Sequence, residues 1–239
     1  MKTDQTKAPR LYCDTSLGQG VAAPLGDEQS HYLLNVMRRQ DGDHIRAFNG
    51  RDGEWMTRLV KIGKKSALLQ CEELIAAQYT PAHKTHLFFA PIKKDRLSFL
   101  IEKSVELGVT DLHPVISDRT ENRHLNFDRL QKQIIEAAEQ CERTDIPVLH
   151  DTAPLASVSD TDFPVMAAIE RDDDIPFMPI TTTPATCGYV TGPEGGWTAS
   201  EIAFLKQCQN IRPVHLGRRI LRAETAIIYM LARGVAEEV

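Results

Sequence analysis

Residues 188–201 read Gly-Tyr-Val-Thr-Gly-Pro-Glu-Gly-Gly-Trp-Thr-Ala-Ser-Glu, a short apolar run followed by a glycine-rich turn. Thr198 and Glu201 have the spacing of a capping box, which marks the start of a helix directly after the turn. The stretch therefore predicts a strand, a loop and a helix in succession. That order is the repeating unit of a parallel α/β sheet.

The same alternation extends over residues 85–239. Helical periodicity predicts helices at 96–107, 126–142, 198–208 and 223–233, and apolar runs predict strands at 86–90, 112–116, 146–149, 165–169, 188–191 and 213–216. Residues 172–184 are rich in Pro and Thr and predict a loop. We therefore expect a parallel-sheet α/β domain in residues 76–239.

The first 75 residues predict a smaller, β-rich unit. Strand-like runs at 44–48, 54–60 and 67–71 are separated by the turn sequences Asn-Gly at 49–50 and Gly-Lys-Lys at 63–65. One helix is expected to begin at Asp27, its N-cap. Short strands joined by turns predict a small β-barrel, which gives two domains, 1–75 and 76–239.

Composition limits the class of protein. The chain is 42% hydrophobic and 26% charged, which is typical of a folded protein. No apolar run approaches the roughly 20 residues of a membrane helix, and the N-terminus has no secretory signal, so we expect a cytoplasmic protein. Five scattered cysteines without a Cys-x-x-Cys pair argue against disulfides and zinc. His83 and His86 have no further ligands near them in the sequence, so no metal is expected.

The net charge of −5 argues against a nucleic-acid partner only until the charge is mapped along the chain. Much of the acid lies in one segment, where a single basic residue, Arg171, stands among seven acidic ones. These are Asp151, Asp160, Asp162, Glu170, Asp172, Asp173 and Asp174. A basic face elsewhere on the protein therefore remains compatible with the sequence.

Two loops carry candidate chemistry, because ligands of open α/β sheets bind where strands end. In residues 192–197, three glycines allow close approach to a ligand, and the carboxylate of Glu194 disfavours phosphate. From spacing alone, a ligand site and a plain strand-to-helix turn are equally good interpretations. In residues 216–225, three arginines suit RNA phosphate or a planar base, although a basic surface loop is the commoner case. Ile220 and Leu221 predict that this loop packs against something.

At these loops the sequence resembles the RsmE family of 16S ribosomal RNA uracil-N3 methyltransferases, within the SPOUT superfamily. The resemblance covers nearly the whole chain, and the order and spacing of its motifs are specific. The matching residues are 31–38 and 42–50; Lys103, Glu106, Leu107 and Gly108; Ser117 and Arg119; 136–141, Arg143 and Pro147; and the loops 192–196 and 216–225. Residues 172–184 and their acidic lead-in match no family motif and are expected to form an outer elaboration.

The resemblance implies an N-terminal PUA-like β-barrel and a C-terminal SPOUT α/β domain tied in a deep trefoil knot. It also implies a homodimer that transfers a methyl group from S-adenosylmethionine to N3 of one uridine in 16S rRNA of the assembled small ribosomal subunit. The residues expected to bind the cofactor are Gly192, Pro193, Glu194, Gly195, Gly196, Leu216, Gly217, Ile220, Leu221 and Thr225.

Uracil N3 carries a proton, so its methylation requires removal of that proton or stabilisation of the anionic base. Arg222 is the expected catalytic residue for the anion, with Glu224 or Glu194 as proton relay. Residues expected to bind RNA are Arg10, Arg38, Lys94, Arg96, Arg119 and Arg123.

The sequence is also compatible with two other functions. A non-catalytic RNA-binding factor would keep the N-terminal unit with a degenerate knot, although both cofactor loops are intact. A nucleotide-dependent α/β enzyme would bind ATP or NAD in place of S-adenosylmethionine, so ligand preference separates the two.

Overall fold

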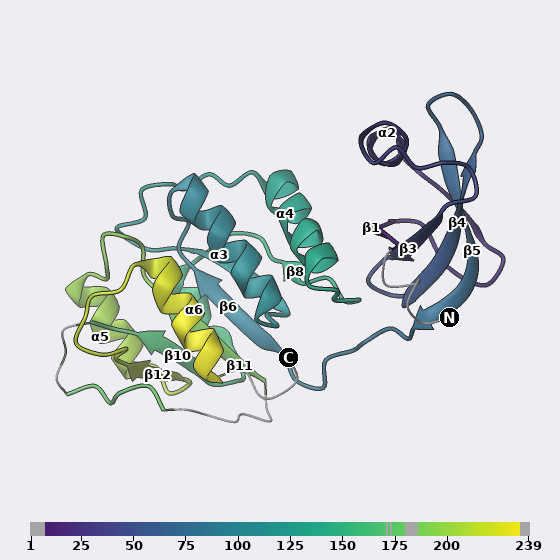
Figure 1. Cartoon of the computed structure of the whole chain (residues 1–239). Helices are drawn as coiled ribbons and strands as arrows, with labels where there is room; N and C mark the ends of the chain where they lie inside the picture. Colours follow the sequence, from purple (N-terminus) through teal and green to yellow (C-terminus); the bar gives the residue numbers. More distant parts are fainter. Residues whose placement is uncertain (1–7, 171, 173, 180–185, 235–239) are drawn as a thin grey trace. The chain divides into compact units, whose positions relative to one another are not determined.

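The computed structural model in Figure 1 describes residues 8–170, 172, 174–179 and 186–234. The chain folds into two compact units. The first comprises Met1–Thr80 and Ala138–Ile146, and the second comprises Pro81–Ala137 and Pro147–Val239. Among the described residues, every helix is too short or too polar to span a lipid bilayer.

The first unit contains a five-stranded sheet in the order β1-β3-β4-β5-β2. Its strands are β1 (Arg10–Tyr12), β2 (Ala22–Pro24), β3 (His44–Phe48), β4 (Glu54–Lys61) and β5 (Ala67–Ala76). β1 pairs with β3 in parallel, and the other pairs are antiparallel. The three strands predicted from the sequence are confirmed, whereas β1 and β2 are too short to show a period of two.

The helix of the first unit starts one residue earlier than expected. Helix α2 (Asp27–His31) has Gly26 as its N-cap, and it continues directly into the π-helical turn η1 (Tyr32–Val36). Asp27 lies instead in the first turn, where a carboxylate interacts favourably with the helix dipole. Leu33 of η1 is fully buried in the hydrophobic core of this unit.

A buried carboxylate, Glu54, joins β4 to β1 and β3. Its two oxygens lie 3.2 Å from Arg10 Nε and 2.6 Å from Arg46 Nε, and its side chain is only 3% exposed. Arg46 also pairs with Glu142 at 2.8 Å, and the Arg10 guanidinium lies 3.6 Å from the centroid of the Phe48 ring. Burial lowers the pKa of Arg10, and the Glu54 carboxylate opposes this shift. Glu54 is therefore the central counter-charge of the unit.

Replacement of this counter-charge by Glu54→Gln should lower the free energy of unfolding of the first unit by about 3–5 kcal/mol, because two buried guanidiniums lose their shared partner. Urea unfolding of a Trp197→Phe background measures the loss, since Trp55 on β4 is then the only tryptophan in the chain. The matched change Glu142→Gln removes a carboxylate whose side chain is 63% exposed. It should cost at most about 1 kcal/mol, and equal losses would contradict the role given to Glu54.

The second unit is built on a parallel sheet in the order β12-β10-β11-β6-β7-β8, with β9 paired to β7. All of its strand pairs are parallel, as the sequence predicts. The strands are β6 (Thr85–Phe89), β7 (Asp111–Ile116), β8 (Val148–Leu149), β9 (Ala153–Pro154), β10 (Val165–Ala168), β11 (Cys187–Thr191) and β12 (Ile211–Val214). The two-residue strand β9 has no recognisable pattern of its own in the sequence.

Four α-helices of this unit confirm the predicted ones within a few residues. Helices α3 (Lys94–Glu106) and α6 (Ala223–Gly234) lie side by side, with α6 packed on β11 (Figure 1). Helix α5 (Ala199–Gln207) packs on β12. Helix α4 (Phe127–Gln140) lies beside α3, and Gln133 at its middle donates a hydrogen bond to Ser98. The short 3-10 helix η2 (Leu155–Asp160) was not expected.

The segment expected to form a Pro- and Thr-rich loop is described only in part. Asp172 and residues 174–179 are irregular apart from a bridge between Phe177 and His215, whereas Arg171, Asp173 and residues 180–185 lie outside the described residues. The trefoil knot remains a prediction.

Candidate functional site

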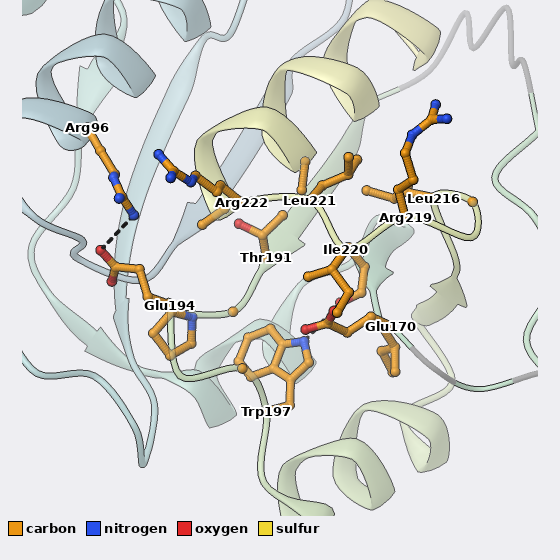
Figure 2. A pocket seen from close by; sticks show the side chains of 18 residues that line it. Arg96, Glu170, Thr191, Glu194, Trp197, Leu216, Arg219, Ile220, Leu221 and Arg222 are labelled. Carbon is orange, nitrogen blue, oxygen red and sulfur yellow. Dashed lines mark hydrogen bonds and ion pairs between the residues drawn. The ribbon is translucent and has the colours of Figure 1, made fainter.

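A pocket of ≈ 270 Å³ opens at the carboxyl-terminal edge of the parallel sheet. Three neighbouring strands, β10, β11 and β12, end at this edge, and the loops that follow them form the walls (Figure 2). The lining residues are Arg96, Ala168, Ile169, Glu170, Thr191, Gly192, Pro193, Glu194, Gly196, Trp197, Leu216, Gly217, Arg219, Ile220, Leu221, Arg222, Ala223 and Ala226. The pocket thus combines apolar walls with a few charged groups, as is typical of ligand sites.

The loop of residues 192–197 needs glycine at two positions for different reasons. A Cβ on Gly192 would lie 3.1 Å from the Trp197 ring, and Gly196 has a φ of +68°, in the region that favours glycine. Trp197 is buried, and its Nε1 donates a hydrogen bond of 2.9 Å to the carbonyl of Ala168. The loop after β11 is therefore anchored to the end of β10.

The predicted capping box is present at the start of α5. The Thr198 side chain accepts a hydrogen bond from the Glu201 amide at 3.2 Å, and Glu201 Oε2 accepts one from the Thr198 amide at 2.7 Å. The other oxygen of Glu201 accepts a hydrogen bond of 2.8 Å from the amide of Asp118. One buried carboxylate thus fixes both the helix start and the turn after β7.

Arg119 on that same turn holds the glycine loop. Its Nη1 donates hydrogen bonds to the carbonyls of Gly195, at 2.9 Å, and of Trp197, at 3.2 Å. A Cβ on Gly195 would lie 3.1 Å from the Cβ of Arg119, so the two segments are in close contact. The guanidinium of Arg119 is engaged within the chain, and its expected contact with RNA remains a prediction.

The loop after β12 is more exposed than the sequence suggests. Gly217 has a φ of +112°, and Arg218, Arg219 and Arg222 are all exposed. Ile220 is 59% exposed, although Leu221 beside it is half-buried. The sequence predicts that Ile220 packs against another part of the protein. In the single chain its side chain is exposed instead.

Arg96 lies between two carboxylates at one side of the pocket. Its Nη1 is 3.9 Å from Glu194 Oε1, and its Nε is 3.8 Å from Glu224 Oε1. Figure 2 shows Arg222 on this same side, while the side chain of Arg219 extends away from it. Two buried oxygens near the pocket, Glu224 Oε2 and Thr191 Oγ1, have no hydrogen-bond partner among the described residues. Such atoms are costly to bury unless a ligand satisfies them.

The structure brings together most of the residues expected at the cofactor site. Gly195 and Thr225 do not line the pocket, because Gly195 faces Arg119 and Thr225 is exposed on α6. Glu224 is buried behind the lining, and Arg96, expected at RNA, lines the pocket instead.

Sequence reasoning missed the contribution of β10. Residues 165–169 were predicted as a strand, and its carboxyl end, with Glu170, lines the pocket beside the two glycine-permitted loops. Glu170 belongs to the acidic segment expected to be an outer elaboration, and that expectation is wrong for this residue. The predicted parallel sheet could have indicated this contribution, because the carboxyl ends of neighbouring parallel strands lie at the same edge.

The remaining residues expected at RNA differ in accessibility. Lys94 and Arg123 are exposed in the second unit, and Arg38 is exposed in the first. Arg10 is buried, with its side chain 6% exposed, and its Nη1 donates to the Ala138 carbonyl at 2.8 Å. Because its guanidinium is buried and bonded within the first unit, Arg10 is not among the proposed RNA contacts.

Comparison with known proteins agrees with this geometry. The family model of an RNA methyltransferase domain matches residues 78–234, and that of an RNA methyltransferase PUA domain matches residues 25–71. These matches confirm the fold types implied by the resemblance, a PUA-like unit followed by a parallel α/β methyltransferase domain. The chain is 31% identical to ribosomal RNA small subunit methyltransferase E of Rickettsia conorii over 232 residues, 95% of each protein.

Two solved structures have a TM-score of 0.82 with this chain. One is ribosomal RNA small subunit methyltransferase E of Neisseria gonorrhoeae bound to S-adenosyl methionine, at 28% identity and covering 94% of this chain and 95% of that one. The other is a putative methyltransferase of Legionella pneumophila in complex with its bound cofactor SAM, at 26% identity, covering 95% and 96%. The chain belongs to the RNA methyltransferase family that includes ribosomal RNA small subunit methyltransferase E.

Proposed function

We propose that this protein transfers a methyl group from S-adenosylmethionine to N3 of a specific uridine in 16S rRNA of the small ribosomal subunit. The observation that carries the proposal is the pocket between the loops of residues 192–197 and 216–222, found in a chain of this methyltransferase family. The relative from Rickettsia conorii is named as a ribosomal RNA methyltransferase, which indicates the substrate. The two similar structures contain bound S-adenosylmethionine, which indicates the cofactor.

The residues of the pocket fit this cofactor. Ile169, Ile220 and Leu221 offer apolar surface for an adenine ring, and the glycines leave main-chain groups accessible. The unpartnered Thr191 hydroxyl at the pocket wall can both donate and accept a hydrogen bond. Glu170 and Glu194 place carboxylates around a ligand that carries a positive sulfonium. S-adenosylmethionine supplies an electrophilic methyl group at that sulfonium.

Arg222 is the proposed catalytic residue for the uracil. It is exposed at the pocket wall, so its guanidinium can approach a base that enters from solvent. A fixed positive charge there stabilises the negative charge that develops on uracil as the N3 proton leaves. Glu194 lines the pocket on the same side as Arg222 and is the proposed acceptor of that proton, whereas Glu224 is buried behind the wall and positions Arg96.

The RNA must present an unpaired uridine, because N3 lies on the edge of the base that forms Watson–Crick pairs. Exposed Lys94 and Arg123 are the proposed phosphate contacts of the second unit, and Arg38 is that of the first. These local basic groups act on RNA in spite of the net charge of −5.

We further propose that the protein acts in the cytoplasm as a homodimer with a trefoil-knotted methyltransferase domain. The location follows from the proposed substrate, ribosomal RNA. The homodimer follows from the resemblance to the RsmE family, and the exposed Ile220 is apolar surface available to a second copy of the chain.

Methyl transfer is tested with isotope-labelled S-adenosylmethionine and small ribosomal subunits that lack the modification. Digestion to nucleosides and mass spectrometry should identify N3-methyluridine. RNA binding without transfer would favour the non-catalytic RNA-binding factor. Thermal stabilisation by ATP or NAD, but not by S-adenosylmethionine, would favour the nucleotide-dependent enzyme.

The variant Arg222→Ala should retain cofactor affinity and lose about 100- to 1,000-fold in the rate of methyl transfer, as for removal of one group that stabilises a developing anion. Single-turnover transfer and cofactor titration measure the two quantities separately. Arg212→Ala is the matched control, since Arg212 is an exposed arginine on β12 that does not line the pocket. An unchanged rate for Arg222→Ala would remove this residue from the mechanism.

Arg119→Gln should weaken S-adenosylmethionine binding by about tenfold, because it removes a charged donor from two carbonyls of the glycine loop. Isothermal titration calorimetry gives the affinity. Arg123→Gln is the control, because the hydrogen bond of Arg123, of 3.5 Å, goes to the carbonyl of Asp118 and not to the loop. Equal affinities for the two variants would show that Arg119 does not support the site.

RNA affinity should fall as salt is added, and Lys94→Ala should make the slope of log affinity against log salt shallower by about 1. Filter binding to small subunits at several salt concentrations measures both effects. Lys206→Ala is the control, because Lys206 is paired with Asp172. A slope unaffected by Lys94→Ala would exclude Lys94 as a phosphate contact.

A further inference from the structure

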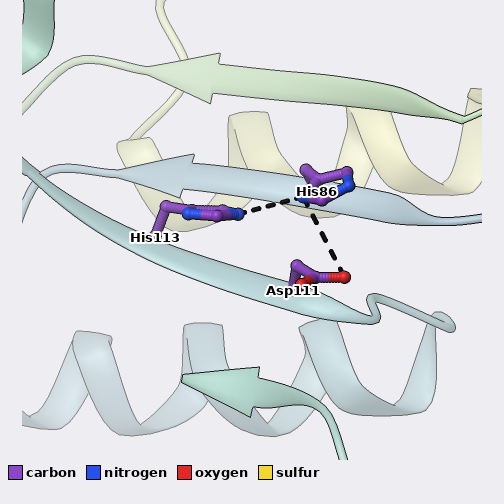
Figure 3. A group of neighbouring side chains, drawn as sticks. All are labelled: His86, Asp111 and His113. Carbon is purple, nitrogen blue, oxygen red and sulfur yellow. Dashed lines mark hydrogen bonds and ion pairs between the residues drawn. The ribbon is translucent and has the colours of Figure 1, made fainter. Parts of the chain in front are cut away.

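Two histidines and an aspartate meet within the parallel sheet, on strands β6 and β7 (Figure 3). His86 is the second residue of β6, and it pairs in register with Asp111, the first residue of β7. His113 follows two positions after Asp111, so the alternation of side chains directs all three to the same face of the sheet. The cluster lies towards the amino-terminal edge, whereas the methyltransferase pocket lies at the carboxyl-terminal edge.

The three side chains offer ligand atoms at the distances of a metal site. His86 Nδ1 is 3.0 Å from His113 Nε2 and 4.0 Å from Asp111 Oδ2, and the three ligand atoms all lie within 4.8 Å of one another. Bonds of about 2.0–2.1 Å in a tetrahedral zinc site place neighbouring ligand atoms about 3.3–3.4 Å apart. Small side-chain adjustments therefore suffice to bring all three atoms onto one ion.

The surroundings hold these ligands in place. Asp111 is 3% exposed and His86 is 8% exposed. Asp111 Oδ1 accepts a hydrogen bond of 2.8 Å from His150 Nε2, and its Oδ2 accepts one of 2.8 Å from the Thr110 hydroxyl. Groups of this kind orient ligands from outside the coordination sphere. The one ammonium near the carboxylate among the described residues is that of Lys84, 3.9 Å from Oδ2 on a largely exposed side chain.

Aromatic stacking fixes the planes of both imidazoles. His86 stacks on Phe163 with ring centroids 4.2 Å apart, and His113 stacks on Phe88, at 4.5 Å, and on His150, at 3.9 Å. Stacked rings lose little further freedom when an ion binds, so the cost of ordering the site is largely met before binding.

We propose that His86, Asp111 and His113 form a binding site for a divalent transition-metal ion of the zinc class, which fastens β6 to β7. Two imidazole nitrogens and one carboxylate oxygen suit Zn²⁺, and water completes the coordination. The ion is structural, because the methyltransferase pocket lies at the opposite edge of the sheet. A metal-free hydrogen bond between the two imidazoles is the competing explanation of the same geometry.

The test uses the untagged full-length protein, stripped of metal by a chelator, with Zn²⁺ alone as the probe. We expect one equivalent to bind and to raise the melting temperature by about 5–10 °C at a free concentration about 100 times the dissociation constant. Co²⁺ should give the visible absorption of a tetrahedral ion without a thiolate charge-transfer band, which excludes the five cysteines as ligands.

Variants separate this site from non-specific binding. Asp111→Asn keeps the shape of a ligand and removes its charge, and should weaken Zn²⁺ binding by more than about 100-fold, whereas His150→Gln should weaken it by about 10- to 100-fold. His83→Gln, at an exposed histidine in the same segment, should leave the affinity unchanged. Melting curves in chelator show whether each variant is folded.

Failure of the wild-type protein to bind an equivalent of Zn²⁺ overturns the proposal whether or not any variant folds. An affinity that Asp111→Asn leaves unchanged also overturns it. S-adenosylmethionine binding in chelator should equal that of the metal-loaded protein, so loss of methyl transfer and loss of metal binding are distinguishable results.

Discussion

The common direction of the strands in the second unit is the constraint on which the rest of its structure depends. In a parallel sheet every strand ends at the same edge, so loops far apart in the sequence are brought together there. The ends of β10, β11 and β12 supply Glu170, Thr191 and Leu216 to one pocket, although about 20 residues or more separate them in the chain. A single reversed strand would move one of these loops to the opposite edge.

Only a few interactions hold these loops in position at the edge of the sheet. The glycine loop after β11 gains its close approach to a ligand from residues that contribute no side-chain packing, and therefore depends on neighbours for support. Arg119 and Glu201 provide it, one by donating to the loop carbonyls and the other by accepting from Asp118 and Thr198. Arg119, which the sequence predicts to bind RNA, thus stabilises the glycine loop of the pocket.

Sequence reasoning succeeds here where the signal is local. The capping box at Thr198 and the alternation of strands and helices depend on residues within one or two turns of each other, and the structure confirms both. It fails where the partner is distant in the chain. From the sequence alone Arg10 is expected to be exposed, as most arginines are. In the fold Glu54 and Phe48 enclose it, and no sequence pattern predicts these contacts.

His86 shows the same limit for a cluster of ligands. Its neighbours in the sequence offer none, but the register of β6 with β7 places Asp111 opposite it and His113 two positions further on. A search for ligands within one segment rejects this histidine, whereas a search across neighbouring parallel strands finds it. The register is set by the packing of the whole sheet, and the sequence of one segment does not specify it.

The charge of the chain has a different meaning once the pocket is known. A net charge of −5 would repel RNA if it were spread evenly over the protein. At the pocket, however, acidic and basic side chains lie close together and favour different substrates. Glu170 and Glu194 are in its wall, where a cationic cofactor is favoured, while Arg222 is exposed where an anionic base is expected. An entirely basic pocket would attract the RNA and repel a sulfonium, and an entirely acidic one would do the reverse. Methyl transfer between these two substrates therefore favours a site of mixed charge, for which the net charge of the chain is a poor guide.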